Sequence, residues 1–145
     1  LCLLASGDLW RKQISGWREH KKESLQLSYK SLIAAVDAYL ETGHDVIVER
    51  AILNDDATID SFVGSGKKHG AEVHEFILTA DKEVIIKRAH ERGFHENGLL
   101  TPQRVEDLWH ATEELRARRP HATVIDTGQL DSNAVYEKVK KYIGL

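Results

Sequence analysis

Charged side chains directly follow the short apolar runs of this 145-residue chain. The residues at these positions are Asp8, Glu49, Arg50 and Asp126. An ionised carboxylate can take a proton from a hydroxyl group or hold Mg²⁺ through water, and a guanidinium binds phosphate oxygens in pairs. These residue types therefore predict chemistry on a hydroxyl or phosphate group. Each position also has a structural interpretation, because Asp8 suits a helix N-cap and Glu49 can pair with Arg50.

Two arginines lie four positions apart in a stretch with helical periodicity. Arg88 and Arg92 therefore share one helix face, one turn apart. Their guanidinium groups suit contacts with phosphates. Arg92 also precedes a glycine-containing segment, so we expect a closing lid at about 92–101. The structural alternative is a pair of cations at a helix C-terminus, with Glu91 and Glu96 as their partners.

The stretch VGSGKKHG, residues 63–70, contains a Gly-Ser-Gly-Lys sequence that suggests a phosphate-binding loop. Such a loop requires Gly-x-x-x-x-Gly-Lys-Ser/Thr between a strand and the helix that it opens. Ser61 stands where the first glycine belongs, and Lys68 stands where the hydroxyl residue belongs. A helical pattern also precedes the glycines. We predict that a helix over 57–63 ends at Gly64 and that this stretch binds no phosphate.

The composition is that of an ordinary globular protein, with 41% hydrophobic and 30% charged residues and a net charge of −3. This charge gives no basic field for nucleic acid, and no apolar run approaches the roughly 20 residues of a membrane helix. Cys2 is the only cysteine, which excludes an internal disulfide and favours a reducing cytoplasm. Because the chain contains no methionine, we expect that part of the N-terminus precedes Leu1.

The hydrophobic pattern alternates between helical and strand periods along the chain. It predicts helices over 25–40 and 57–63, and further helices opened by Thr79, by Thr101-Pro102 and by Asp131, with Gly43 and Gly93 as helix ends. It predicts strands over 45–49, 73–78 and 123–125. Such alternation predicts an α/β domain over residues 1–145 with a parallel sheet covered on both faces. Ligands of these folds bind beyond the carboxyl ends of the strands, where Asp8 and Glu49 are expected.

Four stretches, taken in order, resemble the P-loop kinases of small molecules, which include gluconate kinase-like proteins, chloramphenicol phosphotransferase and zeta-toxin-like kinases. The stretches are SGDLWRKQISGW (6–17), ETGHDVIVER (41–50), FILTADKEVIIKRAHERG (76–93) and TVIDTGQLDSNAVYEKV (123–139). They are similar to the second to fifth strands of that fold with the segments that follow. The resemblance implies a three-layer αβα fold of the P-loop NTPase class.

The part of that fold which carries the family's signature does not occur in the sequence. The missing part is the first strand, the phosphate-binding loop and the first helix. In the resembling kinases the first strand lies in the middle of the sheet, and its loss would leave a hole in the core. We therefore expect roughly 25 further residues, a typical strand-loop-helix length, ahead of Leu1.

The same resemblance implies a role for each candidate residue. Asp8 would orient or deprotonate the substrate hydroxyl, while Arg92 and Arg88 would stabilise the transferring phosphoryl group. Glu49 would act as a Walker-B-like acid that holds Mg²⁺ through water, although the family more usually has an aspartate there. The implied nucleotide-binding residues are Arg92, Asp126, Thr127 and Gly128, and the implied substrate-binding residues are Trp10, Arg11, Glu49 and Arg50. Trp10 equally suits core packing, and the loop after the last strand equally suits a simple turn.

The resemblance thus implies a cytoplasmic kinase that uses ATP and Mg²⁺ to phosphorylate a hydroxyl group of a small molecule, with no membrane partner. The alternative is a non-catalytic nucleotide-binding or interaction domain. A nucleic-acid 5′-hydroxyl kinase is a weaker alternative, because the net charge is acidic. The sequence identifies neither the acceptor, nor a preference between ATP and GTP, nor an oligomeric state.

Overall fold

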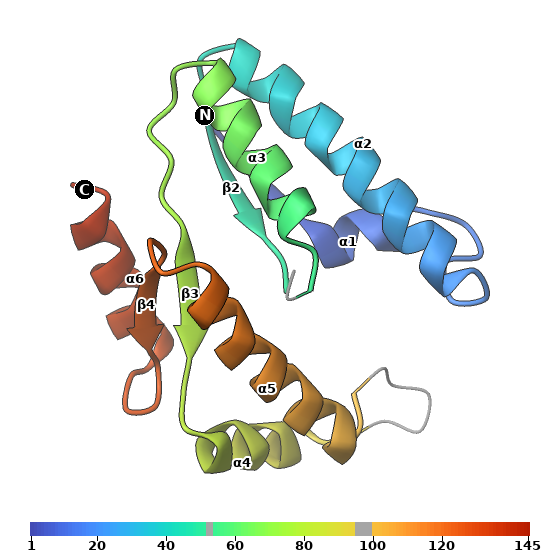
Figure 1. The fold of residues 1–145 in the computed structure, drawn as a ribbon, viewed down its shortest axis with the longest axis vertical. Coiled ribbons are helices and arrows are strands. Elements are labelled where there is room, and N and C mark those ends of the chain that lie inside the picture. Colours follow the sequence, from blue (N-terminus) through green and yellow to red (C-terminus); the bar gives the residue numbers. More distant parts are fainter. Residues whose placement is uncertain (52–53, 95–99) are drawn as a thin grey trace. The chain divides into compact units, whose positions relative to one another are not determined.

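The structure is a computed structural model that describes residues 1–51, 54–94 and 100–145. It divides into two compact units, which we call the N-terminal unit (Leu1–Val73) and the C-terminal unit (His74–Leu145). Each unit consists of one parallel pair of strands with its own helices (Figure 1). The α/β class expected from the sequence is confirmed at this level.

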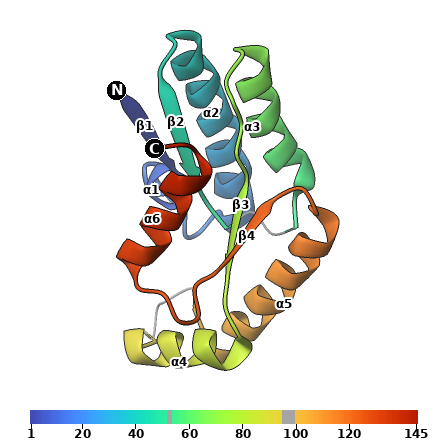
Figure 2. The ribbon, with the colours of Figure 1, turned by 90° about the vertical axis from the view of Figure 1, so that its left-hand side faces the viewer.

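The N-terminal unit is a βαβ arrangement with additional helices. Its elements are β1 (Cys2–Ser6), α1 (Gly7–Lys12), α2 (Lys21–Glu41), β2 (Asp45–Glu49) and α3 (Asp56–Lys68). Strands β1 and β2 pair in parallel, with Cys2 opposite Asp45 and Ser6 opposite Glu49. Parallel neighbours need a long crossover, which α2 provides. Helices α2 and α3 pack side by side (Figures 1 and 2).

The core of the N-terminal unit lies between the strand pair and α2. Ala5, Leu32 and Val36 are almost completely buried there. Leu32 and Val36 are one helical turn apart, so they present one face of α2 to the strands. The opposite face of the strand pair carries Leu4 and Ile47, which are 63% and 58% exposed. Within the described residues, helices therefore cover one face of this strand pair, whereas the sequence predicts helices on both faces.

The C-terminal unit repeats the parallel pairing with different helices. Its elements are β3 (Phe76–Thr79), α4 (Lys82–Arg92), α5 (Pro102–Arg118), β4 (Thr123–Asp126) and α6 (Ser132–Tyr142). Phe76 lies opposite Thr123, and Thr79 lies opposite Asp126. Figure 2 shows α5 and α6 on either side of this strand pair. Both faces contribute to burial, because Ile77 and Ile125 point to opposite faces and are both buried.

Local signals locate several helix ends and one strand correctly. Strand β2 has the predicted bounds, and Gly43 and Gly93 end α2 and α4 with positive φ angles of 74° and 83°. Thr101 and Asp131 cap α5 and α6, since their side chains accept hydrogen bonds from the backbone N–H groups three residues on.

Three boundaries predicted from the sequence are wrong. Helix α3 does not end at Gly64 but continues to Lys68. Gly66 lies inside this helix and serves close packing, because a Cβ there would lie 2.6 Å from Val73 Cγ2. Strand β3 begins at Phe76 rather than at residue 73. Thr79 does not cap the following helix, because its hydroxyl donates a hydrogen bond to Glu113 of α5.

The strands form two separate pairs in the described residues, β1–β2 and β3–β4, rather than the single sheet expected from the sequence. The stretch VGSGKKHG lies in the second half of α3 and the turn after it, not at the start of a helix. Its backbone N–H groups therefore do not converge as those of a phosphate-binding loop do, in agreement with the sequence argument. The three-layer P-loop architecture stays a prediction.

A buried ion pair joins the amino ends of β3 and β4. Glu75 accepts hydrogen bonds from Arg119 Nε and Nη2 at 2.7 and 2.9 Å, and His121 Nε2 lies 2.8 Å from the same carboxylate. The Arg119 side chain is only 8% exposed. Hydrogen bonding from Arg119 holds the pKa of Glu75 below its ordinary value, against the opposing effect of burial.

We predict that Glu75→Gln lowers the free energy of unfolding by about 1–3 kcal/mol at pH 7, because it removes the carboxylate charge that faces the buried Arg119 guanidinium. A carboxyl group with a lowered pKa stabilises the fold at pH values above its ordinary pKa of about 4.3. This stabilisation is lost as the pH falls through the lower pKa of the folded state. The gap between wild type and Glu75→Gln should therefore narrow at acidic pH. Urea denaturation across pH measures it, with Glu114→Gln on the exposed face of α5 as the control; a gap that does not change with pH contradicts the prediction.

Candidate functional site

The carboxyl ends of β1 and β2 bring together three residues that the sequence singled out. Ser6 and Glu49 are register partners at the ends of the two strands, and the Ser6 hydroxyl donates a 2.8 Å hydrogen bond to Glu49 Oε2. Asp8 follows in the first turn of α1, and Arg50 directly follows β2. Because parallel strands end at the same edge, the chemistry-bearing side chains meet there.

Arg50 occupies the centre of this group. Its Nη1 donates to Asp8 Oδ1 at 3.0 Å, its Nε donates to the Tyr29 hydroxyl at 3.2 Å, and its Cζ lies 5.0 Å from the Tyr29 ring centroid. The Arg50 side chain is 8% exposed, whereas Asp8 is 76% exposed. We call Ser6, Asp8, Tyr29, Glu49 and Arg50 the Arg50 cluster. It combines a fixed, buried cation with a carboxylate that solvent reaches.

Gly7 makes room for this arrangement. A Cβ atom at position 7 would collide with Cδ of Arg50 and approach its Nη1 to 3.0 Å. The guanidinium stem thus crosses directly over the backbone between Ser6 and Asp8. Any side chain at position 7 would push Arg50 away from Tyr29 and Asp8.

Trp10 and Arg11, the other predicted substrate-binding residues, both have structural contacts. Trp10 packs against the N-terminal core, and its indole N–H donates to Ser31 Oγ at 2.9 Å. The core-packing interpretation of Trp10 therefore matches its contacts. Arg11 Nε donates to Ser24 Oγ at 3.1 Å and its Nη2 donates to the Lys21 carbonyl at 2.6 Å. Arg11 is consequently tied to the first turn of α2.

The carboxyl ends of β3 and β4 assemble a second group of predicted residues. Arg88 of α4 donates through Nη1 to Thr127 Oγ1 at 3.1 Å and through Nη2 to the carbonyls of Thr127 and Gly128 at 2.7 and 3.3 Å. The Thr127 hydroxyl donates to the Thr79 carbonyl at 2.9 Å. Asp126 Oδ1 accepts from the Gly128 N–H at 2.7 Å, which makes a tight Asx turn.

Arg88 thus holds the loop that follows β4. Arg92, one turn further along α4, is exposed, and no hydrogen bond or ion pair joins it to another described residue. The two arginines, which share one face of α4, therefore differ in their surroundings. Most of the predicted lid, residues 95–99, lies outside the described residues.

Sequence reasoning does not find Tyr29, Gly7 and Thr79 as members of these groups. Tyr29 lies on α2 at a helical position that reads as core, and its contact with Arg50 spans 21 residues of sequence. Gly7 carries a usable signal, since a glycine between a strand and a helix often marks a close approach. Thr79 has the sequence signal of a helix cap, although its carbonyl accepts from both the N–H and the hydroxyl of Thr127.

No group of three or more His, Cys, Asp or Glu side chains is placed to hold a metal ion in the part of the chain that the structure describes. Over the same residues, none of the helices combines the length and apolar character needed to cross a membrane. No family model matches the chain, and comparisons with curated proteins and with solved structures also find no match.

We predict that Gly7→Ala lowers the free energy of unfolding by about 1–3 kcal/mol, because the new methyl group displaces the buried Arg50 side chain. Gly64→Ala is the matched control: it also places alanine for glycine in a helix, but nothing lies within 4 Å of its Cβ position. This control should stabilise the protein by up to about 1 kcal/mol. Chemical denaturation of both variants measures the difference, and a Gly7→Ala protein as stable as Gly64→Ala contradicts the account of Arg50.

Proposed function

We propose that the protein is an ATP-dependent phosphotransferase that acts on a hydroxyl group of a small molecule, with Mg²⁺ as its cofactor. One observation carries the proposal: Asp8, Glu49 and Arg50 meet at the carboxyl ends of β1 and β2. Arg88 meets residues 126–128 at the carboxyl ends of β3 and β4. The carboxyl ends of parallel strands are where α/β folds bind their ligands.

The Arg50 cluster supports a role in acceptor binding. Asp8 keeps most of its surface in solvent, and an ionised carboxylate there can orient an alcohol and accept its proton. Arg50 fixes the Asp8 carboxylate from the buried side through a charge-assisted hydrogen bond. Positioning of this kind is the main contribution that a protein makes to phosphoryl transfer.

The loop of residues 126–128, which Arg88 holds, supports a role in nucleotide binding. In the kinases that the sequence resembles, the loop after the last strand lies beside the adenine and contacts it through its backbone. Here three hydrogen bonds from Arg88 and the Asx turn of Asp126 hold residues 126–128 in one conformation. We therefore assign Arg88 to positioning this loop. Arg92 is assigned to the charge of the transferring phosphoryl group.

Glu49 fits the Mg²⁺ role as a single carboxylate. Mg²⁺ in phosphoryl-transfer proteins retains several waters and takes one or two carboxylates together with the phosphates of its ligand. Glu49 is exposed and uses Oε2 to accept a hydrogen bond from Ser6. The cofactor would supply charge neutralisation at the phosphates, and Ser6 would fix the carboxylate that faces it.

A second candidate is a non-catalytic nucleotide-binding or interaction domain. It is favoured by the apolar side chains that the strands leave exposed, among them Leu4, Ile47 and Leu78 at 63%, 58% and 54%. This candidate predicts nucleotide or partner binding without turnover.

The full-length protein should consume ATP in the presence of Mg²⁺ and a mixture of hydroxylated metabolites, and should form a phosphomonoester. Asp8→Asn should lower this turnover by roughly 10²–10⁴-fold, the usual contribution of a general base. Asp45→Asn, an exposed aspartate at the opposite end of β2, should leave turnover unchanged. Product formation is followed by ³¹P NMR.

Undiminished turnover in Asp8→Asn would remove the assignment of Asp8 as the base. If the wild-type protein forms no phosphomonoester but still binds Mg·ATP, the phosphotransferase proposal fails and the non-catalytic candidate replaces it.

A further inference from the structure

Cations gather where α1 ends and α2 begins. Residues 11–22 contain five lysines and arginines and a single acid, although the whole chain carries a net charge of −3. The five are Arg11, Lys12, Arg18, Lys21 and Lys22. This segment leads on from Asp8, because α1 ends at Lys12. The local charge is therefore opposite in sign to that of the rest of the chain.

Arg11 is held in place by neutral partners. The buried Ser24 hydroxyl and the Lys21 carbonyl accept from Nε and Nη2, and the Arg11 Cζ lies 5.3 Å from the Trp17 ring centroid. Arg11 Nη1 makes no hydrogen bond with any described residue, so its two N–H groups are available to a ligand. Among the described residues no carboxylate pairs with this guanidinium, in contrast to Arg50, which pairs with Asp8.

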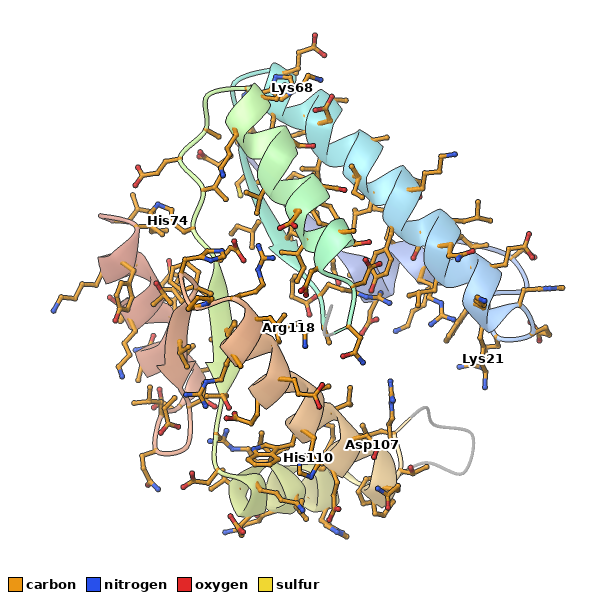
Figure 3. The ribbon with its side chains drawn as sticks, in the orientation of Figure 1. Lys21, Lys68, His74, Asp107, His110 and Arg118 are labelled. Carbon is orange, nitrogen blue, oxygen red and sulfur yellow. The ribbon has the colours of Figure 1, made fainter. Side chains whose placement is uncertain are left out.

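Arg18 brings a second guanidinium to the same aromatic ring. Its Cζ lies 5.0 Å from the Trp17 ring centroid. Lys21, at the start of α2, is exposed, and its backbone carbonyl is the one that accepts from Arg11 (Figure 3). The nearby Glu23 lies 3.9 Å from His20 rather than beside the arginines. Two guanidinium groups therefore lie against a single indole, and one of them is held by hydrogen bonds.

We infer that Arg11 and Arg18, which both lie against Trp17, bind a phosphate group of the acceptor substrate together with Lys21 at the start of α2. A planar guanidinium that is already oriented loses little entropy on binding two phosphate oxygens. Two guanidinium charges beside one indole match a phosphate dianion or diphosphate better than the single charge of a carboxylate. A long nucleic acid fits less well, because its backbone needs a track of cations and the remaining chain is acidic.

The position of Arg11 relative to Asp8 defines the class of acceptor. The two residues are three positions apart on α1, so their Cβ atoms are about 5–6 Å apart on one helix face. An acceptor with its phosphate at Arg11 and its hydroxyl at Asp8 is a small phosphorylated alcohol. This assignment to the acceptor rests on the phosphotransferase function proposed above, whereas binding of the phosphate group does not.

Isothermal titration of the full chain with inorganic pyrophosphate, without ATP, tests the site. Arg18→Gln and Arg11→Gln should each weaken binding at least about tenfold, the usual effect of losing a charge-assisted pair of hydrogen bonds. Lys141→Gln, an exposed cation of α6, is the control and should bind as the wild type does. Arg18 contacts Trp17 but makes no hydrogen bond or ion pair with another described residue, so its variant remains informative if Arg11→Gln unfolds.

Pyrophosphate should also change the fluorescence of Trp17, and this change should be absent in Trp17→Phe. Equal pyrophosphate affinity of wild type and Arg18→Gln overturns the inference, as does a fluorescence change that persists unaltered in Trp17→Phe.

The substrate class has its own test once turnover is measured. Phosphorylated alcohols should be used with a KM at least about tenfold lower than their dephosphorylated counterparts, and Arg18→Gln should remove most of this difference. If dephosphorylated alcohols or 5′-hydroxyl oligonucleotides are used as well as phosphorylated ones, the inference fails while the phosphotransferase function stands. Absence of turnover with every acceptor refutes the function instead, and the pyrophosphate titration then decides the binding site alone.

Discussion

The charge pair between Arg50 and Asp8 depends on the parallel register of β1 and β2, and the rest of the N-terminal site depends on this pair. The register places Ser6 opposite Glu49, so the residues after the two strands, 42 positions apart in sequence, meet at one edge. Burial of Arg50 then imposes further requirements. It needs the Tyr29 hydroxyl for its Nε and the absence of a side chain at Gly7. A buried cation must satisfy its donors, which makes this group a rigid support for the exposed carboxylate.

The C-terminal unit also has a parallel strand pair, but the side chains at its strand ends differ from those of the N-terminal unit. Its strand ends carry hydroxyls, carbonyls and a short Asx turn instead of a buried ion pair, and Arg88 binds them from the surface of α4. The buried ion pair of this unit lies at the amino ends of the strands, between Glu75 and Arg119. In this unit the stabilising ion pair and the candidate functional residues therefore lie at opposite ends of the strands. A polar loop of this kind suits backbone contacts with a ligand, whereas the Arg50 cluster suits proton transfer.

Local sequence signals predict the elements well but not their tertiary use. The β-branched run of β2, the positive-φ glycine after α2 and the cap at Asp131 depend on a few adjacent residues, and each is evident in the sequence. Gly66 resembles part of a helix stop, but the reason for this glycine is the approach of Val73 where the chain turns back after α3. Periodicity identifies an element and its apolar face, but it does not determine how many strands pair in one sheet.

The candidate site is predictable from the sequence only in part. The rule that ligands bind at the carboxyl ends of parallel strands locates Asp8, Glu49, Arg50 and residues 126–128 from the sequence alone. It does not identify Tyr29, which reaches the site from the middle of α2, and it does not separate Arg88 from Arg92.

Two-dimensional ¹H–¹⁵N NMR of the protein during titration with Mg·ATP tests the central claim most directly, namely that the loop at the carboxyl ends of β3 and β4 binds the nucleotide. The account predicts that the largest shifts fall on the amides of residues 126–128 and on the side chain of Arg88, while pyrophosphate shifts the signals of Arg11 and Arg18. Shifts caused by Mg·ATP that avoid residues 126–128, or no shifts at millimolar concentrations, would contradict it.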